Sequence, residues 1–187
     1  NALQVEVDAL VDDVVLEVGT GLGYLSAFCA LRIGSDRVHT FEANPALIPM
    51  IKATYARNGI SPNVHNVILA QGVGTRTFYV EDEFWASSTM SRGKGAMSIE
   101  VPQRDLNAEI DRIKPTFMIV DIEGGEADFF AYAKLEGIRK ICIETHADLI
   151  GNEGITRVFD YIFRHGFLLD FGCIRKNVFY FYREPAH

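Results

Sequence analysis

The sequence has few of the features that mark membrane, disulfide-rich or nucleic-acid-binding proteins. No apolar run approaches the roughly 20 residues that a transmembrane helix needs. The three cysteines are scattered through 187 residues, which excludes a disulfide framework and indicates a reducing compartment, so we expect a cytoplasmic protein. Lys and Arg (18) are outnumbered by Asp and Glu (25), and the formal charge is −7. This acidity argues against nucleic acid or a membrane surface as a partner.

Short β-branched apolar runs alternate with helical patterns along most of the chain, which is typical of an α/β protein. The length fits a single domain over residues 1–187. Strands are expected at 14–16, 38–41, 67–70, 117–121 and 141–144. The pattern predicts a mostly parallel, doubly wound sheet.

The remaining segments complete this picture. Asn44-Pro45 is expected to open a helix that becomes regular a few residues later because of Pro49. Residues 102–113 and 126–135 read as further helices, and 75–80 as an added strand. Residues 167–171 and 177–182 predict an antiparallel C-terminal hairpin. The irregular stretch 81–96, with its single tryptophan, is expected to be a loop over the sheet edge. It is a candidate lining of the acceptor site, and the alternative is that the tryptophan only anchors the loop.

The segment Glu17-Val18-Gly19-Thr20-Gly21-Leu22-Gly23-Tyr24 follows a strand and opens a helix, as a nucleotide-binding turn requires. Glycines let the backbone turn sharply and approach a ligand closely. A dinucleotide fingerprint would need a further glycine at position 24, where Tyr24 stands. The E-x-G-x-G-x-G spacing instead resembles the first motif of S-adenosylmethionine-dependent methyltransferases of the Rossmann-like class. A nicotinamide-dependent oxidoreductase remains the alternative.

A carboxylate ends the second expected strand. Glu42 lies at the ~20-residue offset expected of an acid that binds ribose hydroxyls. Its oxygens can accept hydrogen bonds from both hydroxyls. Two more strand ends carry polar groups, namely Asp121-Ile122-Glu123 and Glu144-Thr145-His146. Because carboxyl ends of parallel strands meet at one edge, we expect these groups to converge. Glu126, by contrast, is interpreted as a favourable acid at a helix N-terminus.

Together these segments resemble the FkbM family of methyltransferases over roughly residues 12–172. The resemblance is carried by residues 15–23, by Phe41-Glu42-Ala43-Asn44-Pro45, by the D-x-E-G-x-E pattern at 121–126, and by Ile143-Glu144-Thr145-His146. It implies a class I Rossmann-like fold, S-adenosylmethionine as cofactor, and O-methylation of hydroxyls on sugars or polyketides. The candidate cofactor-binding residues are Glu17, Gly19, Thr20, Gly21, Gly23, Tyr24, Glu42, Ala43, Asn44, Gln71 and Asp121.

Transfer of a methyl group to an alcohol needs a base or a metal that makes the oxygen nucleophilic. His146 is the candidate base, because an ordinary histidine titrates near pH ~6.5. Asp121 and Glu144 are expected to orient it or to hold the donor's ammonium group. We assign no metal, although Asp121, Glu123 and Glu144 are oxygen ligands of the kind that divalent cations prefer. The expected partner is a small-molecule or glycan acceptor, and a non-catalytic binding module remains a second alternative.

Overall fold

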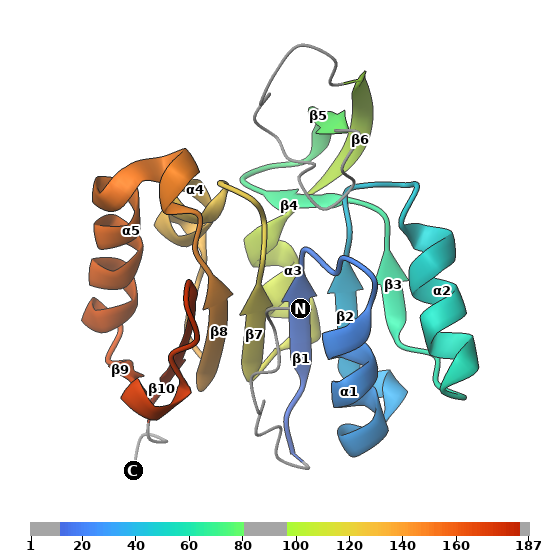
Figure 1. The fold of residues 1–187 in the computed structure, drawn as a ribbon, viewed down its shortest axis with the longest axis horizontal. Coiled ribbons are helices and arrows are strands. Elements are labelled where there is room, and N and C mark those ends of the chain that lie inside the picture. Colours follow the sequence, from blue (N-terminus) through green and yellow to red (C-terminus); the bar gives the residue numbers. More distant parts are fainter. Residues whose placement is uncertain (1–11, 81–96, 184–187) are drawn as a thin grey trace.

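The larger of two sheets has seven strands in the order β3-β2-β1-β7-β8-β10-β9 (Figure 1). The computed structural model describes residues 12–80 and 97–183, so the expected loop at 81–96 lies outside the described residues. The strands of this sheet are β1 (Val15–Val18), β2 (Val38–Phe41), β3 (Asn63–His65), β7 (Phe117–Val120), β8 (Lys140–Glu144), β9 (Leu168–Leu169) and β10 (Val178–Tyr182). The five strands β3, β2, β1, β7 and β8 run parallel, whereas β10 pairs antiparallel with β8 and β9. The expected parallel sheet with an antiparallel C-terminal pair is confirmed.

Alternating residues of the central strands face opposite layers of helices, because side chains along a strand point to opposite faces. The helices are α1 (Tyr24–Ile33), α2 (Ile48–Arg57), α3 (Leu106–Ile113), α4 (Glu126–Tyr132) and α5 (Ala147–Arg164). Leu16 and Met118 belong to the core that α3, α4 and α5 share. Val15 and Phe117 belong to the core on the side of α1. Both faces of the sheet are therefore covered, as a doubly wound fold requires.

A second, three-stranded sheet lies beyond the carboxyl ends of the main parallel strands (Figure 1). It consists of β4 (Ile68–Ala70), β6 (Met97–Asp105) and β5 (Gly74–Val80), in that order. Strand β6 pairs parallel with β4 and antiparallel with β5. Tyr132 on α4 anchors this sheet through Asp105, whose Oδ2 accepts hydrogen bonds from the Tyr132 hydroxyl and the Gly72 amide, each at 2.8 Å. These hydrogen bonds hold the small sheet in place beyond the carboxyl ends of the parallel strands.

Three sequence expectations are wrong in detail. Residues 67–70 were expected in the main sheet, but its third strand is the preceding β3, and β4 belongs to the small sheet. The helix expected from Pro102 begins only at Leu106, because residues up to Asp105 extend β6. The strand expected over 167–171 covers only Leu168–Leu169, and a 3₁₀ turn at Phe171–Cys173 follows it. Helix α2 does start late, at Ile48, with Pro49 in its first turn.

At the amino ends of the parallel strands, a buried carboxylate joins three segments of the chain. Asp13 accepts hydrogen bonds from Thr116 Oγ1 at 2.8 Å, from Arg139 at 2.9 Å and from Lys140 at 2.7 Å. Its side chain is fully buried. A buried carboxylate with this many donors fixes the start of β1 against β7 and β8. Among the described residues no helix has the length and apolar character needed to cross a bilayer.

Candidate active site

The glycine turn after β1 lies between the ends of β2 and β7. Gly19 has φ +82°, and its amide donates to the Phe41 carbonyl at 2.9 Å. A Cβ at this position would lie 1.6 Å from the backbone oxygen of Asp121. Only glycine fits such an approach in the left-handed region. The expected turn is therefore packed against both neighbouring strand ends, which leaves the crevice above it open.

Glu42, at the end of β2, is held by the turn itself. Its Oε2 accepts a hydrogen bond from the Gly21 amide at 3.0 Å, and its Oε1 accepts one from the Asn44 amide at 2.8 Å. Burial raises the pKa of this carboxyl group, and these backbone donors act in the opposite direction. A carboxylate has about four acceptor sites, so capacity remains for ligand hydroxyls. The two motifs identified in the sequence are thus one connected structure.

A cavity of about 530 Å³ opens above these elements. Such a volume is in the range that small ligands and cofactors occupy. Six of the predicted cofactor residues line it, namely Gly19, Gly21, Glu42, Ala43, Gln71 and Asp121. The small sheet contributes Arg76 and Phe78, and α4 contributes Asp128 and Tyr132. The cavity therefore extends from the glycine turn to the small sheet and α4.

The other predicted cofactor residues support the turn from outside this lining. Glu17 is buried below it, and burial raises the pKa of Glu17 to about 8, although hydrogen bonds with Ser26 and Thr20 act to lower it. Thr20 Oγ1 donates to the Phe41 carbonyl at 3.3 Å. Gly23 precedes α1, and Tyr24 is its exposed first residue. Asn44 Oδ1 accepts a hydrogen bond from the Ala46 amide at 3.0 Å, in the turn that leads to α2.

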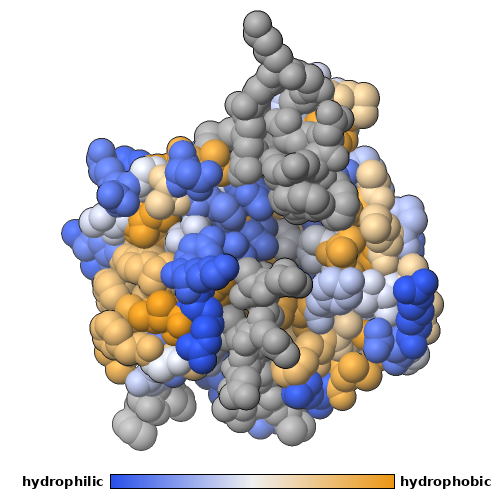
Figure 2. Space-filling view, in the orientation of Figure 1, coloured by the Kyte–Doolittle hydropathy of each residue, from blue (hydrophilic) through white to orange (hydrophobic). Residues whose placement is uncertain are grey.

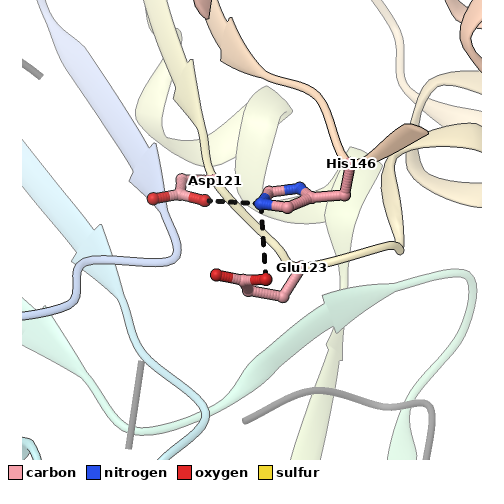
Figure 3. Close-up of side chains that lie close together, drawn as sticks. All are labelled: Asp121, Glu123 and His146. Carbon is pink, nitrogen blue, oxygen red and sulfur yellow. Dashed lines mark ion pairs between the residues drawn. The ribbon is translucent and has the colours of Figure 1, made fainter. Parts of the chain in front are cut away.

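Two acids of the turn after β7 lie beside the imidazole of His146, which follows β8 (Figure 3). His146 Nε2 lies 3.3 Å from Glu123 Oε2 and 3.8 Å from Asp121 Oδ1. Asp121 and Glu123 line the cavity, whereas His146 lies behind them, 8% exposed. Hydrophilic side chains gather over this region (Figure 2). The predicted convergence of Asp121, Glu123 and His146 is therefore present in the fold.

The sequence interpretation missed the partner on the other side of the ring. Glu126, the fully buried first residue of α4, has Oε1 2.5 Å from His146 Nδ1. The same oxygen accepts a hydrogen bond from the Gly124 amide at 3.1 Å. The sequence interpretation assigned this acid to the N-terminus of the helix, where acids such as Asp128 are also favourable. The fixed spacing D-x-E-G-x-E was the available signal.

Glu144 lies apart from the imidazole. Its Oε1 accepts a hydrogen bond from Asn177 Nδ2 at 2.9 Å, and its negative charge acts on Asp121. Within residues 12–80 and 97–183, the three donors close enough to share a cation, all within 4.8 Å of one another, are from Asp121, Glu123 and His146. The carboxylate trio weighed from the sequence is thus replaced by two carboxylates and an imidazole.

The acids of this cluster perturb one another. Burial, together with the charge of Glu144, raises the pKa of Asp121 well above its ordinary range. For His146, burial favours the neutral ring, but the hydrogen bond to Glu126 and the charges of Glu123, Glu126 and Asp121 prevail and raise its pKa to about 9. Asp121 Oδ1 is buried without a hydrogen-bond partner among the described residues. A crevice with this surplus of negative charge suits a cationic ligand.

Comparison with known proteins gives the family. The family model of the methyltransferase FkbM domain matches residues 13–169. This chain belongs to the FkbM methyltransferase family. It is accordingly an S-adenosylmethionine-dependent methyltransferase, and the resemblance noted in the sequence is confirmed. No match was found among curated protein sequences.

Solved structures agree on the fold of this FkbM-family chain. A chain of a fibrillarin/Nop5p complex has a TM-score of 0.55 and 12% identity, covering 94% of this chain and 74% of that one. A putative O-methyltransferase from Klebsiella pneumoniae has a TM-score of 0.52 and 12% identity, covering 94% and 75%. A precorrin-6y C5,15-methyltransferase from Geobacter metallireducens has a TM-score of 0.50 and 15% identity, covering 94% and 82%. At such identities the likeness concerns the Rossmann-like fold.

Proposed function

We propose that this protein is an O-methyltransferase that modifies a hydroxyl group of a sugar, glycan or polyketide-like small molecule. The observation that carries the proposal is the Asp121–Glu123–His146 cluster, two members of which line the same cavity as the glycine turn. S-adenosylmethionine supplies an activated methyl group as a sulfonium. The protein must then bind both reactants, align them and accept one proton.

Donor binding is assigned to the residues at the ends of β1 and β2. Gly19 and Gly21 allow close approach of the backbone, and Glu42 presents a fixed carboxylate to ribose hydroxyls. Asp121, whose Oδ1 is buried without a hydrogen-bond partner among the described residues, offers an acceptor to the donor's ammonium group. Residues of these types at these positions fit a nucleoside carrying positive charge.

Proton acceptance is assigned to His146. A hydroxyl is a weak nucleophile while it keeps its proton, and a nearby base removes that barrier. Glu123 lines the cavity and lies 3.3 Å from His146 Nε2, so the hydroxyl proton has a short route to the imidazole. In the balanced reaction the acceptor oxygen loses its proton to His146 and bonds to the methyl carbon, while the S–CH₃ bond breaks and its electron pair stays on sulfur, which leaves neutral S-adenosylhomocysteine.

The acceptor is assigned to the part of the cavity formed by the small sheet and α4. Phe78 offers an apolar surface, while Arg76, Asp128 and Tyr132 offer polar groups. This mixture suits a hydroxylated molecule with an apolar face, such as a sugar ring. We propose a cytoplasmic location because all three cysteines, Cys29, Cys142 and Cys173, are free thiols.

The test combines donor binding with an acceptor screen. S-adenosylhomocysteine binding is measured by calorimetry, and methyl transfer is then assayed against glycans, free sugars and small alcohols. His146→Gln should lower turnover by about 10²- to 10⁴-fold while leaving S-adenosylhomocysteine affinity unchanged. His165→Gln, at the half-buried residue that follows α5 and lies outside the cavity lining, is the matched control. Donor binding without transfer to any hydroxyl would favour a non-catalytic module instead.

A further inference from the structure

The buried carboxylate of Glu126 has surroundings that its position in the helix does not explain. An acid that only complements a helix dipole needs no specific side-chain partner and is commonly solvated. Glu126 is instead 0% exposed, and its Oε1 is shared between His146 Nδ1 and the Gly124 amide. Burying a carboxylate is costly unless strong hydrogen bonds compensate it. A favourable interaction with the helix dipole therefore does not account for the burial of this carboxylate or for its contact with His146.

We propose that Glu126 is a positioning residue that fixes the tautomer and orientation of His146, so that Nδ1 carries the proton and Nε2 is left to face Glu123 and Asp121. This inference rests on the proposed function, because it assigns how the proposed base is prepared. A carboxylate can only accept hydrogen bonds, so Nδ1 must donate. The neutral ring then has its lone pair on Nε2, which is the nitrogen 3.3 Å from Glu123 Oε2.

Glu126 also fixes the turn that carries Glu123. Glu123 has φ +49° and Gly124 has φ +96°, so two successive residues adopt left-handed backbone conformations. For a residue with a Cβ this conformation is unfavourable, and such outliers persist where the surroundings over-determine them. The Gly124 amide donates to the same Glu126 oxygen that contacts His146. One carboxylate thereby sets both sides of the Glu123–His146 contact.

Glu126 differs from the other acids of this region in the side of the imidazole that it contacts. Asp121 follows β7, Glu123 lies in the turn before α4, and Glu144 ends β8. Asp121 and Glu123 face Nε2 and line the cavity, and Glu144 acts on Asp121. Glu126 alone among these acids meets Nδ1, away from the cavity lining. It can therefore orient the ring without touching the acceptor.

The decisive variant is Glu126→Gln, which keeps the size of the side chain and removes its charge. Its amide can donate to Nδ1 and thereby stabilise the opposite tautomer, with the proton on Nε2. Turnover should fall by about 10²-fold or more, as expected for loss of a base. The KM for the donor should stay within about twofold. Glu153→Gln, an identical change on the exposed surface of α5, is the matched control.

The direct readout is ¹⁵N NMR of the imidazole, followed to about pH 10 in the whole protein, with and without S-adenosylhomocysteine. In the wild type, Nε2 should lose its proton while Nδ1 keeps its own, and Glu126→Gln should shift the neutral ring toward the Nε2-protonated form. The pH–rate profile of that variant should also move to lower pH, because the nearest carboxylate has been neutralised.

The outcomes separate this inference from the proposed function. A wild-type ring that keeps its proton on Nε2 overturns the positioning role, and this measurement needs no variant to fold. An unchanged tautomer and unchanged turnover in Glu126→Gln overturn it as well. If Nδ1 is protonated as expected but His146→Gln retains full turnover, the positioning stands and the assignment of His146 as the base fails.

Discussion

The Gly21 amide donates a hydrogen bond of 3.0 Å to Glu42 Oε2, joining the glycine turn after β1 to the end of β2. The same carboxylate accepts from the Asn44 amide at 2.8 Å. The acid expected to bind ribose therefore also holds in place the backbone that the donor must approach. Loss of Glu42 should affect both the ligand contact and the shape of the turn.

Replacing Glu42 with Gln should weaken S-adenosylhomocysteine binding by about 10- to 100-fold. Hydrogen bonds to a charged group contribute about 1.5–3 kcal/mol, and about 1.4 kcal/mol corresponds to a tenfold change in Kd. Titration calorimetry measures the change. Glu100→Gln, an exposed substitution on β6, should bind like the wild type. Equal affinity in both variants would remove Glu42 from the donor site.

Gly19→Ala should abolish donor binding and destabilise the fold, because its Cβ would lie 1.6 Å from the Asp121 oxygen. Gly137→Ala provides a matched comparison: its φ is +83° against +82° at Gly19, and nothing lies within 4 Å of its Cβ. The control should lose only the roughly 1–2 kcal/mol of a left-handed alanine. Urea unfolding and S-adenosylhomocysteine titration distinguish the two. Comparable behaviour would mean that close approach to β7 is unimportant.

Methyl transfer should become faster as the pH rises to about 9, because the neutral ring is the form that accepts a proton and the pKa of His146 is raised to about 9. The value of kcat/KM reports groups of the free enzyme and is the quantity to follow. An ordinary histidine would give a rising limb near pH ~6.5. A profile that is flat between pH 6 and 9 would contradict the assignment of His146 as the base.

Chelation should leave turnover unchanged, since His146 Nε2 is assigned to the proton and not to a metal. The assay is run after EDTA treatment and again with added Mg²⁺ or Mn²⁺. A loss of activity that either cation restores would reassign Asp121, Glu123 and His146 as ligands, because their donor atoms lie within 4.8 Å of one another.

Asp13→Asn should lower the free energy of unfolding by about 3 kcal/mol, as expected when one partner of a buried ion pair is removed. Lys140 and Arg139 both contact this carboxylate. Asp111→Asn breaks the exposed pair with Lys134 and should lower the free energy of unfolding far less, because solvent screens that pair. Denaturant midpoints at constant m-value give both numbers. Similar values would show that the Asp13 network contributes no more than a surface pair.

The strands that the sequence predicted best are those whose side chains are buried on both faces. Phe117–Val120 is a continuous apolar run and Val15–Val18 is one interrupted only by Glu17, because helices cover both sides of the sheet. Strand β3 was missed because Asn63-Val64-His65 is a short, polar edge strand. Pro102 suggested the start of a helix, but it lies within β6. Strand β4 pairs only with Gln103–Asp105 of β6, so Pro102 lies outside that pairing, where a proline is tolerated.

The site also has a part that the sequence predicted and a part that it did not. Glycines and strand-end acids follow from chain-local patterns, so Gly19, Glu42 and Asp121 were identified from the sequence and line the cavity. The Glu126–His146 contact joins residues that lie on different elements. The sequence of this segment is compatible with both roles of Glu126, as an acid at a helix N-terminus and as a partner of His146. Only the three-dimensional path of the turn at Glu123–Gly124 distinguishes them.

The pairing of β1 with β7 has a consequence for how the protein reaches its working state. Val15 lies beside Phe117 and Val18 beside Val120, although β2 to β6 intervene in the chain. Parallel contacts of such long sequence separation form slowly, because the loop entropy is lost before the contacts stabilise it. The glycine turn and the acids after β7 meet only when this pairing closes. The ability to bind S-adenosylmethionine should therefore arise late in folding, so that ligand binding during refolding reports completion of the sheet.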